Sequence, residues 1–258
     1  MNEPLKIERR GACAWLVLNR PAAGNAIDAH LAEALGGAAA MLRDDAAARV
    51  VVITGEGALF CAGGDIRAFA AADSAADAVD AITSRLHPAI ETFAALPKPI
   101  ITLVNGAAAG AGLGLALLGD VVLAARSAHF MSAYTAIGLT PDGATSWLLP
   151  RLVGLRRAQD LILSNRRVSA EEAERIGMIT RAVDDDQLVG EGQRLAEHLA
   201  GSAVGACAAA RELLFGSFSN TLHEQLVAEA RMISSRADSR EGSEGIASFL
   251  EKRAADYS

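Results

Sequence analysis

The segment VNGAAAGAG, residues 104–112, connects a β-rich run at 100–104 to helix-like sequence. A second glycine-bearing turn, FCAGGDI at residues 60–66, also follows a β-rich stretch and leads towards helix-like sequence. Such connections leave backbone N–H groups without partners, and two donors of this kind can hold one oxyanion. The pair of turns therefore predicts chemistry in which negative charge develops on an acyl oxygen, without specifying the reaction.

Outward from these turns, strand-like and helical pieces alternate through the first half of the chain. Strands are expected at 14–18, 49–54, 100–104 and 121–124, and helices at 28–44, at 82–95 and in a short piece from 110. The stretch 68–80, rich in Ala, Asp and Ser, is expected to be a mobile surface loop or loose helix. This alternation predicts a layered α/β core.

Beyond residue 155 the strand signals fade and helical patterns follow one another. Helices are predicted near 155–164, 169–176, 186–201, 203–214, 220–236 and 239–253. Ser169 and Glu172 form a capping-box pattern, and Gly177 suits the end of that helix. We therefore expect an α/β core over residues 1–190 and a C-terminal helical appendage over 191–258.

The overall charge argues against a nucleic-acid partner. The chain carries a formal charge of −7, whereas phosphate neutralisation needs a clustered basic surface. Its cysteines, Cys13, Cys61 and Cys207, form no Cys-x-x-Cys pair, so neither a disulfide framework nor a zinc site is indicated. No targeting segment is recognised, and we expect a cytoplasmic protein.

The nearly uncharged stretch 100–118 has two further interpretations. It could be taken for a membrane span, but Asn105-Gly106 interrupts it, and a buried strand-turn-helix explains it better. The spacing Gly110-x-Gly112-x-Gly114 also suggests a dinucleotide loop, but the full fingerprint and its strand context are not met. We therefore expect no membrane partner and favour oxyanion binding at this turn.

Both turns, together with NRP at 19–21, PKPI at 97–100 and GLTPD at 138–142, resemble the crotonase (enoyl-CoA hydratase/isomerase) superfamily over nearly the whole chain. The resemblance implies a spiral core of β-β-α turns and places the two oxyanion-hole amides on Gly64 and Ala111. It also implies an acyl-CoA thioester substrate with no separate cofactor or metal. The C-terminal helices are then a trimerisation region, in a homotrimer or a dimer of trimers.

The departures from the hydratases of this superfamily bear directly on function. Their two active-site glutamates correspond here to Gly114 and Tyr134, while Asp142 is a retained carboxylate at a family-matched position. Adding water requires two groups, whereas one base can move a proton between carbons. Asp142 and its surroundings look most like ring-1,2-epoxyphenylacetyl-CoA isomerases and Δ3,Δ2-enoyl-CoA isomerases, so an isomerase is predicted. A Pro-Asp-Gly turn would also explain this aspartate without any catalysis.

His87 keeps other functions open. It matches a histidine of 4-chlorobenzoyl-CoA dehalogenases, in which the counterpart of Asp142 is the nucleophile, although Tyr134 replaces the tryptophan that supports that nucleophile. A surface or packed role for His87 is the alternative. The remaining functional alternatives are a hydratase, a thioester hydrolase and a non-catalytic acyl-CoA-binding protein.

The resemblance also predicts the residues that bind the substrate. They are Ala62, Asp65, Ile66, Arg67, Gly114, Tyr134, Phe249 and Lys252. Arg67 is a candidate phosphate partner, and Phe249 and Lys252 resemble the last helix that reaches the CoA of a neighbouring subunit. Solvated surface charge is the alternative for both cations.

Overall fold

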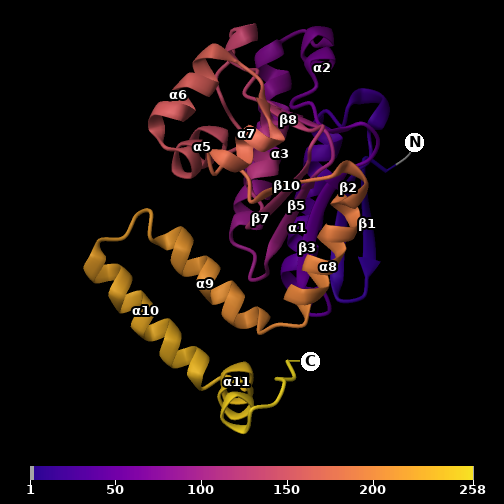
Figure 1. Ribbon diagram of the computed structural model, residues 1–258. Helices are drawn as coiled ribbons and strands as arrows, with labels where there is room; N and C mark the ends of the chain where they lie inside the picture. Colours follow the sequence, from indigo (N-terminus) through magenta and orange to yellow (C-terminus); the bar gives the residue numbers. More distant parts are fainter. Residues whose placement is uncertain (1–2, 258) are drawn as a thin grey trace.

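The computed structural model describes residues 3–257, which form two β-sheets flanked by helices (Figure 1). The larger sheet has the strand order β1-β2-β3-β5-β7-β10. Its strands are β1 (Leu5–Arg10), β2 (Cys13–Leu18), β3 (Val50–Gly55), β5 (Ile100–Val104), β7 (Val121–Ala125) and β10 (Arg181–Val183). β1 pairs antiparallel with β2, and the other neighbours pair parallel.

The central strands are apolar along most of their length because helices cover the sheet. Every residue of β5 and the first four of β3 are buried, as expected for parallel strands enclosed on both faces. Helices α1 (Ala29–Asp44) and α3 (Ala75–Ala94) pack against each other, and α8 (Leu188–Ala200) packs on β2, β3, β5 and β7. Asp28 caps α1 by accepting the Leu31 N–H at 2.8 Å.

A smaller sheet carries the two glycine turns. Its strands, in the order β4-β6-β8-β9, are β4 (Leu59–Cys61), β6 (Ala107–Ala109), β8 (His129–Met131) and β9 (Val168–Ser169). The chain visits the sheets alternately: β3 and β4 lead to α2 (Ile66–Ala71), β5 and β6 to α4 (Ala111–Leu117), and β7 and β8 towards α5 (Thr145–Val153). This arrangement confirms the predicted spiral of β-β-α turns.

Residues 155–257 are mainly helical, with two short strands, β9 and β10, among the helices. The further helices of this part are α6 (Leu155–Ser164), α7 (Ala170–Arg175), α9 (Val204–Gly216), α10 (Leu222–Ala237) and α11 (Arg240–Glu251), and short 3-10 turns lie at Pro21–Ala23, Thr135–Ile137 and Asp185–Gln187. Figure 1 shows α9, α10 and α11 extending away from the sheets. The predicted division at residue 190 falls within α8, and α9 is the next helix after it.

One buried arginine ties this helical part to the core. Arg211 on α9 donates from Nε to Asp120 Oδ1 at 2.7 Å and also reaches the carbonyl oxygens of residues 93, 94 and 96. Residues 93 and 94 are the last of α3, and residue 96 lies just beyond it, where side-chain donors commonly bind the carbonyl groups of a helix end. Arg211 therefore holds α9 against the helix that also forms one wall of the site described below.

Several elements differ from the sequence expectations. The stretch 68–80 is mostly ordered helix: α2 continues to Ala71, and α3 begins at Ala75, where Ser74 Oγ accepts the Asp77 N–H at 3.2 Å. The structure adds β1, β6, β8, β9, β10 and α5, which the sequence analysis did not predict. Within residues 3–257, no single helix combines the length and apolar composition needed to cross a bilayer; the bent pair 185–200 and 204–216 meets that test only when joined.

Candidate active site

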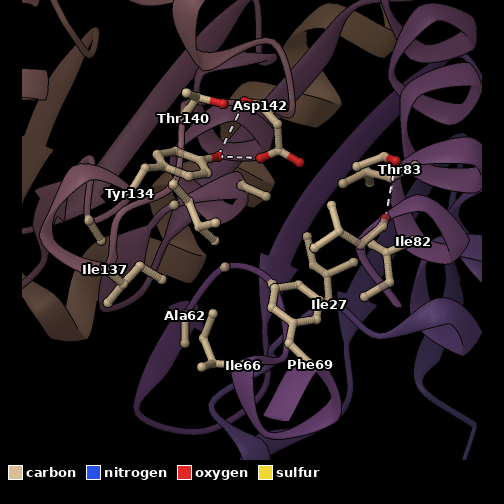
Figure 2. Close-up of a pocket in the computed structure, with 18 residues that line it drawn as sticks. Ile27, Ala62, Ile66, Phe69, Ile82, Thr83, Tyr134, Ile137, Thr140 and Asp142 are labelled. Atoms are coloured by element: carbon tan, nitrogen blue, oxygen red, sulfur yellow. Dashed lines mark hydrogen bonds between the residues drawn. The ribbon is translucent and has the colours of Figure 1, made fainter. Parts of the chain in front are cut away.

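A cavity of about 310 Å³ lies between the β4–α2 connection, helix α3 and the segment 133–142 (Figure 2). From α3, the side chains of Val79, Ile82, Thr83 and Leu86 line it, at the spacing of one helix face. Its other lining residues are Ile27, Ala62, Gly63, Gly64, Ile66, Phe69, Gly110, Ala111, Ala133, Tyr134, Ile137, Leu139, Thr140 and Asp142. The cavity thus brings both glycine turns and Asp142 together.

The first predicted oxyanion donor, the Gly64 N–H, lies beside a short parallel bridge. Ile27 donates its N–H to Gly63 O at 2.7 Å and accepts the Asp65 N–H at 3.0 Å. In parallel pairing, the amide between two such bonds points away from the partner strand. Gly64 N–H has no hydrogen-bond acceptor among residues 3–257, so it is free to bind a ligand.

The second predicted donor, the Ala111 N–H, opens α4. The first N–H groups of a helix have no acceptor within it, and no other acceptor for Ala111 lies in the described part of the chain. The two turns touch at Gly63, whose φ of 96° favours glycine. A Cβ at Gly63 would lie 2.8 Å from Ala109 O and 3.4 Å from Ala111 N. The structure therefore places both predicted donors at one wall of the cavity.

The carboxylate of Asp142 is bound to a tyrosine. Tyr134 Oη donates to Asp142 Oδ1 at 2.6 Å, with Asp142 O at 3.2 Å (Figure 2). Burial, followed by the negative charge of Asp142, raises the pKa of Tyr134 well above its ordinary value. Tyr134 is therefore a neutral donor that fixes one carboxylate oxygen and leaves Oδ2 for other partners.

The backbone on either side of this pair is strained. Ala133 has a φ of 64° and Ala144 a φ of 65°, a left-handed conformation that non-glycine residues rarely adopt. Ala133 directly precedes Tyr134, and Ala144 follows Asp142 by two residues and precedes α5. Strain of this kind accumulates where a structure must hold functional side chains in a fixed geometry.

His87 reaches the same carboxylate from α3. Its Nε2 lies 3.7 Å from Asp142 Oδ2, and 46% of the histidine side chain is exposed, against 29% for the aspartate. His87 thus stands at the edge of the site rather than lining the cavity. Among the residues described, no group of three or more His, Cys, Asp or Glu side chains converges as a metal site would require.

The other predicted substrate-binding residues fall into different environments. Ala62 and Ile66 line the cavity, whereas Asp65 caps α2 and pairs with Arg20 at 3.1 Å. Arg67 is exposed on α2. Contacts of these residues with a nucleotide stay a prediction.

Gly114, Phe249 and Lys252 do not line the cavity. Gly114 is buried in α4, where a Cβ would lie 1.9 Å from Gly143 O. Phe249 lies on α11 and Lys252 directly after it, at the end of the molecule far from α2 (Figure 1). Their predicted contact with the CoA of a neighbouring subunit is not tested by a single chain.

Apart from Ala62 and Ile66, the sequence analysis missed the apolar side chains that shape the cavity. Phe69 packs close to Gly64, where an added Cβ would lie 3.1 Å from the ring. Ile82 and Thr83 face the site from α3. The available signal was the spacing of Val79, Ile82 and Leu86, which predicts one apolar helix face.

The spiral of β-β-α turns thus places the paired amides of Gly64 and Ala111 and the carboxylate of Asp142 on one cavity. The sequence profile of the Enoyl-CoA hydratase/isomerase family matches residues 8–258. The chain is 39% identical over 252 residues to a probable enoyl-CoA hydratase of Rhodobacter capsulatus, covering 96% of this chain and 95% of that protein. It is 38% identical over 247 residues to the 1,2-epoxyphenylacetyl-CoA isomerase of Escherichia coli, covering 94% and 93%.

Solved structures of similar proteins support the same family assignment. A crystal structure of an enoyl-CoA hydratase from Polaromonas sp. JS666 superimposes with a TM-score of 0.93 at 36% identity, covering 98% of this chain and 99% of that one. The protein belongs to the enoyl-CoA hydratase/isomerase family and has the crotonase fold. Its relatives include both hydratases and an isomerase, so family membership alone leaves the reaction open.

Proposed function

We propose that this protein is an acyl-CoA isomerase that acts through a thioester enolate, shifting a double bond or isomerising an epoxide ring. One observation carries the proposal. Among the described residues that line the cavity, Asp142 alone has a carboxylate, and its bonded partner is the neutral hydroxyl of Tyr134. The site thus combines one base with two backbone donors.

This geometry supports the following reaction. The thioester oxygen binds the N–H groups of Gly64 and Ala111, which makes the protons on the neighbouring carbon more acidic. Asp142 removes a proton from carbon 2 of a Δ3-enoyl thioester, and the electrons move into a dienolate whose oxygen the two donors stabilise. The same carboxyl group returns the proton to carbon 4, giving the Δ2 isomer. Tyr134 keeps the carboxylate oriented throughout.

Hydration would need a second acid/base group. Gly114 and Tyr134 stand where hydratases carry glutamates, and Gly114 packs directly on the backbone at Gly143. A longer side chain at 114 has no room without movement of the loop that carries Asp142. The E. coli relative named as an isomerase supports the choice of reaction.

The test compares both reactions side by side. Purified protein should convert a Δ3-enoyl-CoA to its Δ2 isomer faster than it hydrates crotonyl-CoA at matched concentration. Asp142→Asn should keep CoA-ester binding while lowering isomerisation by at least ~10²-fold. Faster hydration that survives this substitution would refute the isomerase. Binding without turnover of straight-chain, aryl or cyclic acyl-CoAs would indicate a non-catalytic protein.

His87 supports a second candidate, a hydrolytic or dehalogenating reaction on the same thioester. Its Nε2 lies 3.7 Å from Asp142 Oδ2, a position from which it can assist attack of water on an aspartyl ester. Release of halide or of free CoA, abolished by His87→Gln, would support this candidate. An isomerase that keeps its rate in His87→Gln would exclude the histidine from the main reaction.

We also propose that the protein assembles as a homotrimer or a dimer of trimers through α9, α10 and α11. Large apolar side chains on these helices are open to solvent, including Phe249 at 82% and Leu250 at 73% exposure. Mass measured by light scattering tests the assembly. Lys252→Ala should weaken binding of a CoA ester more than binding of the same acyl group on pantetheine; equal losses would point to folding or assembly instead.

A further inference from the structure

We infer that the acyl group accepted by this cavity is uncharged and apolar to its far end. The inference rests on the proposed function, because it concerns the same cavity. It distinguishes acyl thioesters with aliphatic or aryl tails from those that end in a carboxylate or a quaternary ammonium group.

The wall opposite Tyr134 and Asp142 is apolar. Figure 2 shows Ile27, Ile66, Phe69 and Ile82 on one side of the cavity, with Tyr134 and Asp142 on the other. Ile27 is completely buried and Ile82 is 5% exposed, so these two side chains belong to the packed interior, whereas Ile66 is 49% exposed at the cavity's edge. An acyl chain that extends from the thioester towards them gains apolar contacts and loses water.

The single hydroxyl group that α3 contributes to the cavity wall already donates a hydrogen bond within the helix. Thr83 Oγ1 donates to the carbonyl oxygen of Val79 at 3.1 Å, one turn back along α3. This bond satisfies the hydroxyl within the helix. Thr83 therefore contributes no free donor that would bind a tail carboxylate.

No lysine or arginine lines the described cavity. Arg20 lies near the Gly64 turn, but it is held by Asp28 at 2.9 Å and by Asp65 at 3.1 Å. A tail carboxylate would thus enter an apolar space without a cationic partner, and Asp142 would repel it. An unpaired buried charge is strongly disfavoured.

A cationic tail is also poorly matched. Quaternary ammonium groups bind where several aromatic faces or a carboxylate surround them, and the far wall offers Phe69 alone among aliphatic side chains. Asp142 is bonded to Tyr134 at the reacting end. The tail end of the site therefore lacks both kinds of partner.

The test uses saturated thioesters, whose binding requires no reaction. Dissociation constants of hexanoyl-CoA, phenylacetyl-CoA, adipoyl-CoA and 4-(trimethylammonio)butanoyl-CoA are measured by calorimetry on the wild-type protein. Adipoyl-CoA should bind at least about 100-fold more weakly than hexanoyl-CoA, and the cationic ester at least about 10-fold more weakly. Binding of either charged ester within about threefold of hexanoyl-CoA would overturn the inference.

A pair of lysine variants tests whether the cavity is the origin of this selectivity. Thr83→Lys places a cation on the cavity wall, whereas Ser84→Lys places one on the exposed face of the same helix. Thr83→Lys should lower the ratio of the adipoyl-CoA to the hexanoyl-CoA dissociation constant by at least about tenfold. Ser84→Lys should leave this ratio unchanged. An equal effect of both would contradict the inference. If Thr83→Lys fails to fold, the wild-type panel alone decides.

These outcomes are separable from those of the proposed function. A protein that binds neutral esters selectively but isomerises nothing would refute the isomerase and keep the apolar cavity. A protein that isomerises enoyl esters with charged tails as fast as neutral ones would keep the isomerase and refute the apolar cavity.

Discussion

Adding one methyl group at Gly114 tests the packing that separates this site from a hydratase. In the interior of a helix, Gly→Ala normally stabilises by about 1 kcal/mol. At Gly114, however, the new Cβ would lie 1.9 Å from Gly143 O. To reach even a tight contact of 3.0 Å, the backbone must move by about 1.1 Å.

The expected cost follows from this displacement. Overpacking of a well-packed interior costs about 1–3 kcal/mol, and it here opposes the gain of about 1 kcal/mol from helix propensity. We expect Gly114→Ala to lower the free energy of unfolding by up to about 2 kcal/mol. Because Gly143 directly follows Asp142, a shift of about 1 Å should also lower turnover by about 10²-fold.

Gly37 provides the matched control. It lies in the interior of α1, is exposed, and has no atom within 4 Å of an added Cβ. Gly37→Ala should therefore stabilise the protein by up to about 1 kcal/mol and keep full activity. The free energy of unfolding of the two variants is measured from the midpoint and slope of urea unfolding, and their activity from isomerase rates. A Gly114→Ala protein as stable and active as Gly37→Ala would refute the packing argument.

Three further expectations concern the donors, the aspartate and the C-terminus. Tyr134→Phe removes the 2.6 Å bond to Asp142 and should lower kcat by about 10-fold with KM little changed; an unchanged kcat would remove Tyr134 from the mechanism. Ala111→Pro deletes one donor and should lower the rate by about 10²–10³-fold in a variant whose circular dichroism and ligand binding match the wild type; full activity would exclude this amide. Arg253 lowers the pKa of Glu244 to about 2, so this carboxylate stabilises the folded C-terminus above about pH 4.5, and its contribution is lost as pH falls from there towards 2. In limited proteolysis, cleavage near the C-terminus should become faster as the pH falls across that range, and Glu244→Gln should remove this pH dependence. A wild-type cleavage rate that does not depend on pH would contradict the role of Glu244.

Much of the α/β core was predictable because its central elements carry strong local signals. The run at 50–54 is apolar and β-branched, and it lies within β3. β1 was missed because four of its six residues, Lys6, Glu8, Arg9 and Arg10, are charged, so only part of the strand is apolar. β9 and β10 have two and three residues, too few for any period to appear. α5 contains Pro150, which argues against a helix when the sequence is read alone.

The site was less accessible to sequence reasoning because its parts lie far apart in the chain. The approach of the Gly64 and Ala111 turns depends on pairing across the small sheet, and only the family resemblance connected them. The bond between Tyr134 and Asp142 joins two residues whose spacing of eight indicates no regular element. Asp65 was predicted from the resemblance alone to bind substrate, whereas its position before α2 also matches a helix cap.

The division of the fold into a large and a small sheet has a consequence for amide hydrogen exchange. The strands that carry the two turns contain three residues or fewer, whereas β2 and β3 contain six. Short strands open locally at a lower free energy than a broad, fully buried sheet. Amides of β4, β6 and β8 should therefore exchange through local opening while those of β3 and β5 exchange only with global unfolding. A ligand bound by the two turns should therefore slow amide exchange first in the small sheet.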